Sequence, residues 1–414
     1  MRHNHLSYGS TDVSTLLGIL MMREHFVANE ADFLKSCDLI AKSGVFGFDT
    51  EFVSEESFRP ELCLVQVATP EDLFVIDAIA VGSLGAFWDL ATDGKRNVIV
   101  HAGREEIRIC QHLSGKAPAR LFDIQVAAGL IGIGYPAGYG TLVQTFAGTR
   151  LSKQETLTDW RIRPLTAEQI TYAFDDVRYL LQCHEKISAR LLELDRIDWA
   201  EEEFADLQAR SNLDEPMGER WRRVKGTSGF DRKRLAMVRE IVAWREEFAA
   251  KRNRPPRAIL RDDLIADIVK RNPQKAQDIL AFRGVQHRDS EEIMAAIQKA
   301  RALPTDSLPL QDETKPDAPQ VGLIGQVMAG LLGDLCNRKS LVPSLVATSS
   351  DLRELVRSKI DNTSLSDNNS LAKGWRLKHV FPVLMDFLEG KTSLRLARVD
   401  NESPFEYDDS KPNP

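Results

Sequence analysis

Two carboxylates, Asp49 and Glu51, stand two positions apart in the stretch VFGFDTEFV at positions 45–53. Its aromatic and β-branched residues predict a β-strand, in which successive side chains point to opposite faces. Asp49 and Glu51 would then lie side by side on one face. Like charges are costly in a protein interior, and a bound metal ion is one of the few environments that stabilise them. The alternative is an edge strand whose acidic face is solvated, and this stretch alone does not decide between the two.

Further acidic side chains lie later in the chain. Glu105 and Glu106 follow the apolar stretch 97–101 and open a predicted helix, where acids also complement the helix dipole. Asp123 stands among apolar residues, and capping the helix that follows is the expected role for it.

Tyr172 and Asp176 lie four positions apart in a predicted helix, so the phenol and the carboxylate share one face. Alone, this pair would be read as a surface acid beside a packing stripe. Hydrolysis by two metal ions needs several carboxylates around hard cations about 3.5–4 Å apart, and a group that orients the attacking water. The acidic residues and Tyr172 together supply these parts, which favours a metal-dependent hydrolytic site.

The surrounding pattern predicts an α/β domain that ends near Asp195. The expected elements are a helix at 29–42 with Asn29 as its N-cap, an antiparallel meander of strands at 45–53, 61–69 and 72–77, a helix at 81–91, a strand at 97–101, a helix at 104–113, an apolar stretch at 121–132 and an interrupted helical pattern at 141–179. Strands come first and then alternate with helices, so helices should cover both faces of the sheet.

Length and composition are those of an ordinary protein of two or three domains, with 414 residues and a net charge of −7. The five cysteines are scattered and form no C-x-x-C pair, which predicts neither disulfides nor a zinc knuckle and favours a reducing cytoplasm. Because no apolar run approaches the ~20 residues that span a bilayer, no membrane association is expected. Residues 1–24 are expected to be a poorly ordered extension.

Beyond position 195 the pattern is helical, with no visible strand. Residues 196–215 are expected to be a connecting helix, 216–303 a helical domain, 304–320 a proline-rich linker, 321–396 a second helical domain and 397–414 an acidic, disordered tail. Between Arg220 and Arg261 there are fourteen Lys/Arg and four acidic residues, with Trp221 and Trp244 among them. A solvated helical face is one explanation of such a run, but its single sign favours contact with nucleic-acid phosphates.

Several motifs in the first 176 residues resemble those of the ribonuclease D family. The matching motifs are Asp49-Thr-Glu51, LCLVQ at 62–66, LSKQ at 151–154, TDWRIRPL at 158–165 and Tyr172-Ala-Phe-Asp-Asp176. The stretch 216–303 resembles an HRDC domain, through WRRVKG at 221–226 and RPPRAILRDD at 254–263, and 321–396 resembles one more weakly. The resemblance implies a ribonuclease H-like mixed sheet with helices on both faces at 25–195, followed by two all-α HRDC-type domains.

The resemblance also implies a mechanism with two divalent cations, Mg²⁺ or Mn²⁺. Asp49 would bridge both ions, Glu51 and Asp176 would complete one, Glu106 would hold the other, and Tyr172 would orient the attacking water. The implied reaction is 3′-to-5′ hydrolysis of RNA from a free 3′ end by a monomer, which releases nucleoside 5′-monophosphates, with precursors of transfer RNA as substrates. The substrate contacts expected near the site are His101, Lys153, Trp160, Arg163 and Gln169, and a structural role for Trp160 is an equal alternative.

The family's usual aspartate is replaced by Glu106, in HAGREEI at 101–107. The charge and the ligand atoms are kept and the side chain is one methylene longer, so we expect retained but weakened activity. Two other functions stay open at this point: a DNA 3′ exonuclease on the same scaffold, and an RNA-binding protein that has lost its activity.

Overall fold

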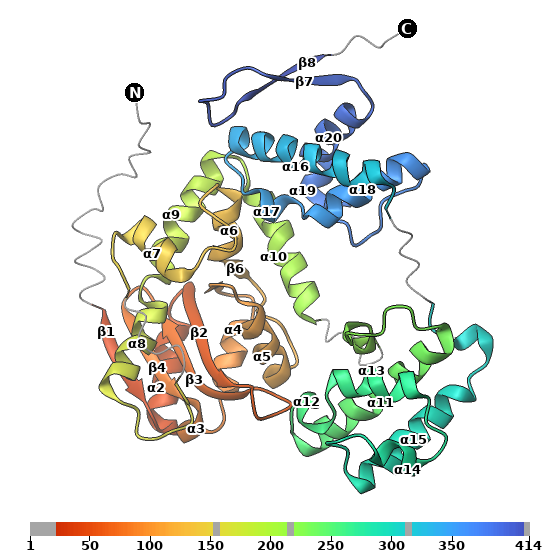
Figure 1. The fold of residues 1–414 in the computed structure, drawn as a ribbon. Coiled ribbons are helices and arrows are strands. Elements are labelled where there is room, and N and C mark those ends of the chain that lie inside the picture. Colours follow the sequence, from red (N-terminus) through yellow and green to blue (C-terminus); the bar gives the residue numbers. More distant parts are fainter. Residues whose placement is uncertain (1–21, 152–157, 213–218, 311–316, 410–414) are drawn as a thin grey trace.

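A six-stranded mixed sheet forms the centre of the N-terminal part of the chain (Figure 1). The computed structural model describes residues 22–151, 158–212, 219–310 and 317–409. The strands are β1 (Arg23–Val27), β2 (Val45–Val53), β3 (Glu61–Ala68), β4 (Asp72–Asp77), β5 (Asn97–Val100) and β6 (Leu121–Asp123). Their order across the sheet is β1-β4-β3-β2-β5-β6.

Strand β2 lies inside this sheet, antiparallel to β3 and parallel to β5. It therefore has a strand on each side, and the solvated edge strand is excluded. Strands β2, β3 and β4 form the expected antiparallel meander, and the parallel pairs β2–β5 and β5–β6 make the sheet mixed. The predicted fold class of the N-terminal domain is confirmed.

Helices cover both faces of the sheet. One core joins β2 side chains such as Phe46 and Phe48 to helices α2, α4 and α5, and the other contains helices α6 to α9. The helices of this part are α2 (Glu30–Ala41), α3 (Ala78–Val81), α4 (Gly85–Thr92), α5 (Arg104–Ser114), α6 (Ile124–Leu130), α7 (Tyr139–Ala147), α8 (Ala167–Arg178), α9 (Leu180–Glu193) and α10 (Ile197–Asn212). The Asn29 side chain caps α2 as expected, because its Oδ1 accepts from the backbone N–H of Asp32 at 2.9 Å.

One expectation about this part is wrong, and another is incomplete. Arg23 and Glu24 are not part of a disordered extension, because they belong to β1, which pairs with β4. Helix α10 is more than a connection, because Ala200 and Phe204 are buried in the same core as α6 and α9.

The first helical unit, Arg220–Pro309, has a core of its own. It contains the 3-10 turn η1 (Arg220–Arg223), α11 (Arg232–Arg252), α12 (Pro256–Ile259), α13 (Asp262–Arg271), α14 (Ala276–Leu280), α15 (His287–Arg301) and η2 (Thr305–Ser307). The expected linker begins later than predicted, because Leu308 is buried in this core and Arg232 donates to the carbonyl oxygens of Leu308 and Pro309.

The second helical unit, Pro319–Leu388, packs on the sheet-containing part instead of standing apart (Figure 1). It contains α16 (Pro319–Lys339), α17 (Pro343–Val346), α18 (Ser349–Asp361), η3 (Ser370–Ala372), α19 (Gly374–His379) and α20 (Phe381–Leu388). Its buried side chains join those of α6 to α10 in one continuous hydrophobic core. The indole rings of Trp199 and Trp375 stack across the junction with centroids 4.6 Å apart.

The expectations for the C-terminal end are wrong. Strands β7 (Thr392–Leu396) and β8 (Phe405–Asp409) form an antiparallel hairpin where a helix and then a disordered tail were expected. The hydroxyl group of Tyr407 donates to the buried Asp334 carboxylate of α16, which fastens the hairpin to the second helical unit. The sequence did not predict these strands because it is polar and because the alternation of apolar and polar residues runs over only five residues in each strand.

Among the described helices, none combines the length and the hydropathy needed to cross a membrane. All five cysteines are buried and free.

Candidate active site

The two faces of β2 explain where its acids point. Phe46 and Phe48 are fully buried and contact Phe87, with ring centroids 5.8 and 5.6 Å apart. Because side chains alternate along a strand, this aromatic packing turns Asp49 and Glu51 to the other face. Both acids are partly exposed there.

Helix α8 approaches the same face of β2 and carries Tyr172 and Asp176. The turn from α8 to α9 comes close because Gly47 has no side chain: a Cβ atom at Gly47 would lie only 3.0 Å from Leu180. A capping box fixes the start of α8, where the Thr166 side chain accepts from the backbone of Gln169 and Gln169 Oε1 accepts from the backbone N–H of Thr166.

Glu106 enters from the other side, in the first turn of α5. The carboxylate of Asp123 holds the preceding loop, because it accepts from the backbone N–H groups of Ala102 (3.2 Å) and Gly103 (2.8 Å). The same carboxylate caps α6 through the backbone N–H of Gln125 at 2.8 Å, as expected. Glu106 is 6% exposed, and the Thr50 hydroxyl donates to its Oε1 at 2.9 Å.

The four carboxyl groups influence one another strongly. Burial, and after it the negative charge of Asp49, raise the pKa of Glu51 to about 8 and that of Asp176 to about 9. Burial also raises the pKa of Asp49 and, well above its usual range, that of Glu106. The charge of Asp49 contributes to the raised pKa of Glu106, whereas the neighbouring Glu106 side chain lowers the pKa of Asp49. In the metal-free protein the group therefore holds extra protons at neutral pH.

Tyr172 completes this group. Burial raises the pKa of its phenol, and the charges of Asp176 and Glu51 raise it further. The hydroxyl group consequently stays protonated across the physiological range and hydrogen-bonds to the carboxyl group of Asp176. A neutral phenol beside several carboxyl groups can hold a water molecule by hydrogen bonding.

The donor set suits a hard divalent cation, because carboxylate oxygens are the ligands that Mg²⁺ and Mn²⁺ prefer. In the described part of the chain, however, no three His, Cys, Asp or Glu side chains already converge closely enough to hold a metal ion. The Glu106 carboxyl group is held at β2 by the hydrogen bond that it accepts from Thr50. The carboxyl groups thus share a site, and their side chains must turn to bind an ion together.

Four of the five expected substrate contacts, Arg163, Trp160, Gln169 and His101, have partners within the protein. Arg163 forms a two-pronged ion pair with the buried Asp77, at 2.5 and 2.7 Å, and donates to the carbonyl oxygen of Trp160 at 2.6 Å. Trp160 is 4% exposed and packs 6.0 Å from the ring of Tyr172, which favours its structural alternative. Gln169 is 8% exposed and serves the capping box.

His101 lies beside the acidic group, and its charge would lower the pKa of Asp49. Its Nε2 is 2.9 Å from the carbonyl oxygen of Ala137, so this nitrogen is the protonated one in that contact. Lys153 lies outside the described residues.

Sequence reasoning missed two supporting residues, Thr50 and Asp77. Thr50 lies between Asp49 and Glu51 in the sequence, and its hydroxyl group is on the aromatic face of β2. A polar residue on the buried face of a strand needs a hydrogen-bond partner, and this pattern could have singled out Thr50 from the sequence. Asp77 ends β4, and only the folded structure brings it to Arg163, 86 positions away.

Comparisons with known proteins relate this chain to a family of nucleases. A family model described as a 3′-5′ exonuclease matches residues 25–192, and the HRDC domain model matches residues 234–300. A ribonuclease D of Sphingobium indicum is 33% identical over 86% of this chain and 92% of its own length. The chain belongs to the ribonuclease D family. By this relationship it is a 3′-5′ exoribonuclease.

Other relatives support the same assignment. A ribonuclease D of Bartonella henselae is 31% identical over 84% of this chain and 86% of its own length. The crystal structure of Escherichia coli RNase D, described as an exoribonuclease involved in structured RNA processing, matches with a TM-score of 0.78 and 22% identity. It covers 89% of this chain and 99% of its own, and at that identity it supports the fold alone.

Proposed function

We propose that this ribonuclease D family member hydrolyses RNA from a free 3′ end with two divalent cations, Mg²⁺ or Mn²⁺, and releases nucleoside 5′-monophosphates. The observation that carries the proposal is the group of four carboxyl groups, from Asp49 and Glu51 of β2, Glu106 of α5 and Asp176 of α8, with the Tyr172 phenol beside them. The raised pKa values of these carboxyl groups agree with it. Buried acids that repel one another are stabilised when cations bind between them.

The residues would divide the work as follows. Asp49 would help to hold both ions, Glu51 and Asp176 would help to hold the first, and Glu106 would help to hold the second. Such ions would lower the pKa of the attacking water and stabilise the leaving 3′ oxygen. The neutral hydroxyl group of Tyr172 would orient that water, and Asp123 would position Glu106 through the loop of Ala102 and Gly103.

We further propose that the substrates are structured RNAs with a 3′ tail, such as precursors of transfer RNA. The Escherichia coli protein with the same fold is described as acting in structured RNA processing, which supports this class. The basic first helical unit would contact the RNA, and the protein would act as a monomer. The match of 234–300 to the HRDC model supports the first part of this proposal. We also propose that the second helical unit is an HRDC-like domain.

The test uses a transfer-RNA precursor with a 3′ tail, incubated with Mg²⁺, with Mn²⁺ or with a chelator. The wild-type protein should release mononucleotides one at a time from the 3′ end, and the Asp49→Ala variant should not. Equal product from both proteins would contradict the proposed site. Competition between an RNA and a DNA of the same sequence would reveal a DNA exonuclease, and RNA binding without turnover would reveal a protein that has lost its activity.

A further inference from the structure

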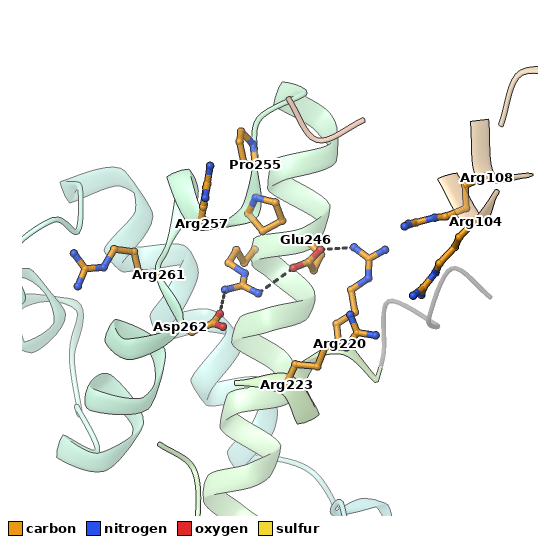
Figure 2. A pocket seen from close by; sticks show the side chains of 11 residues that line it. Arg104, Arg108, Arg220, Arg223, Glu246, Pro255, Arg257, Arg261 and Asp262 are labelled. Carbon is orange, nitrogen blue, oxygen red and sulfur yellow. Dashed lines mark hydrogen bonds and ion pairs between the residues drawn. The ribbon is translucent and has the colours of Figure 1, made fainter. Parts of the chain in front are cut away.

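A cleft of about 550 Å³ separates helix α5 of the sheet-containing part, which is the nuclease part of the chain, from the first helical unit (Figure 2). Seven arginines line it, against the two acids Glu246 and Asp262. One end lies near a direct contact between the two parts, where the backbone N–H of Arg59 donates to Asn253 Oδ1 at 3.3 Å. Such an excess of one charge marks a site for a polyanion.

Helix α5 connects this cleft to the acidic site. Arg104 and Arg108 are four positions apart and therefore share one face of α5, while Glu106, two positions from each, points to the opposite side. Figure 2 shows Arg104 and Arg108 reaching from α5 toward the first helical unit. The cleft thus lies about one helix diameter, ~10 Å, from the catalytic carboxyl groups.

The opposite wall is built on a buried base. Glu246 is 2% exposed, accepts from Arg220 at 2.7 Å and from Arg245 at 3.0 Å, and thereby holds both guanidinium groups in place. Arg245 is itself buried and also binds Asp262 at 2.5 Å.

Three further arginines, Arg223, Arg257 and Arg261, complete the wall and are exposed. In Figure 2 they lie along the first helical unit, on the far side of the cleft from Arg104 and Arg108. Arginine suits phosphate recognition because its planar fork can bind two phosphate oxygens at once.

We propose that this arginine cleft binds the phosphodiester backbone of the single RNA strand that leads to the active site, a few nucleotides from the 3′ end. The inference rests on the proposed function. The carboxyl groups of the site repel an incoming phosphate chain, so the chain needs cationic groups close by to hold it. The cleft supplies them from two parts of the protein, and RNA bound in it would join the first helical unit to the nuclease part.

The test compares the double variant Arg104→Ala/Arg108→Ala with a matched control, Arg190→Ala. Arg108 pairs with Glu105, and Arg190 pairs with Glu193, each three positions away in the same helix. The two arginine side chains are 40% and 38% exposed. Arg190 does not line the cleft. The full-length proteins are assayed with Mg²⁺ on a dinucleotide and on a long single-stranded RNA, and the ratio of the two kcat/KM values is measured.

The double variant should lower the ratio of long RNA to dinucleotide by roughly tenfold, mainly through KM, and the control should not. In an Asp49→Ala background, which binds without cleaving, the slope of log Kd against log salt should shrink by about 1.4 for two lost contacts. The variant Arg257→Ala/Arg261→Ala, on the other wall, should act in the same direction, so a folding defect in one pair cannot mimic the result.

The outcomes separate the two proposals. A wild-type protein that cleaves no RNA would overturn the proposed function. A wild-type protein that cleaves RNA, together with both double variants showing the length ratio and salt slope of Arg190→Ala, would overturn the cleft alone.

Discussion

At the scale of single residues, Glu106 is the acid whose type departs from the motif that the sequence otherwise resembles. It accepts a hydrogen bond from the Thr50 hydroxyl at 2.9 Å. A glutamate keeps the carboxyl group of an aspartate and places it one methylene further from the backbone. Because Glu106 is buried, its carboxyl group can turn toward a metal ion only when its hydrogen bond with Thr50 breaks.

Removing the charge of Glu106 should therefore cost more than shortening its side chain. We expect Glu106→Gln, which keeps size and the bond to Thr50, to lower kcat by roughly 10²-fold, since a displaced or missing ligand has effects of that size. Glu106→Asp should stay within about tenfold of the wild type because it keeps the charge. Steady-state cleavage of a 3′-tailed RNA measures both, and a fully active Glu106→Gln would remove this residue from the metal site.

The raised pKa values make a second prediction at this scale. Glu51 and Asp176 have folded pKa values of about 8 and about 9, above those of an unfolded chain, so the folded protein binds more protons than the unfolded one between about pH 4.5 and 9. Stability should then fall as pH rises through that window, by about 1–3 kcal/mol, when a chelator is present.

Mg²⁺ should remove most of this loss, because a bound cation replaces the protons. Thermal unfolding from pH 5 to 9 with chelator and with Mg²⁺ measures the effect, and Glu51→Gln/Asp176→Asn should flatten the chelator curve. A chelator curve that rises toward pH 9, or one that the double variant leaves unchanged, would contradict the assignment.

At the scale of elements, the site depends on how α8 and its preceding loop are held against the sheet. The aromatic face of β2 orients Asp49, and Gly47 allows the turn from α8 to α9 to approach. Arg163 ties the loop before α8 to Asp77 at the end of β4. This ion pair holds the loop close to the site.

Breaking this ion pair should reduce stability. Arg163→Met leaves the buried Asp77 carboxylate uncompensated, and we expect a loss of about 2–3 kcal/mol, reduced from the cost of a fully buried pair because the Arg163 side chain is 25% exposed. Asp77→Asn/Arg163→Met should recover part of it, since Asn still caps α3. Denaturant unfolding measures the cycle, and a large rise in KM for RNA without any loss of stability would restore Arg163 as a substrate contact.

At the scale of the whole molecule, the two helical units have different relations to the nuclease part. The second unit shares one core with it, and beside the stacked Trp199 and Trp375 the indole N–H of Trp375 donates to Glu203 at 2.8 Å. Glu203 also pairs with Arg376. The first helical unit has a separate core and meets the nuclease part across the arginine cleft. The second unit is therefore part of the nuclease fold, whereas the first unit folds around a core of its own.

Matched tryptophan variants test this difference. Trp375→Ala should destabilise the nuclease part and the second helical unit together by about 3–5 kcal/mol, because Trp375 is 1% exposed in their joint core. Trp221 is 4% exposed in the core of the first helical unit. Trp221→Ala should therefore lower the unfolding temperature of that unit alone, as a separate transition. Calorimetry of the full-length variants distinguishes the two, and a Trp375→Ala protein whose nuclease transition is unshifted would contradict the shared core.

The sequence by itself determined β2, the meander that follows it, the start of α2 at Asn29 and the residues of the acidic group. These features rest on local patterns, which are alternation along a strand, side-chain caps and residues four apart on a helix. The family motifs spread over 45–176 identified the activity for the same reason, since each motif is contiguous in the chain.

Only the tertiary structure decided which polar residues have structural roles and where the helical units lie. The pairing of Arg163 with Asp77, the joint core at Trp375 and the cleft between α5 and the first helical unit all join residues far apart in the sequence. Such contacts depend on which faces the folded elements bury against each other, and no local pattern carries that information.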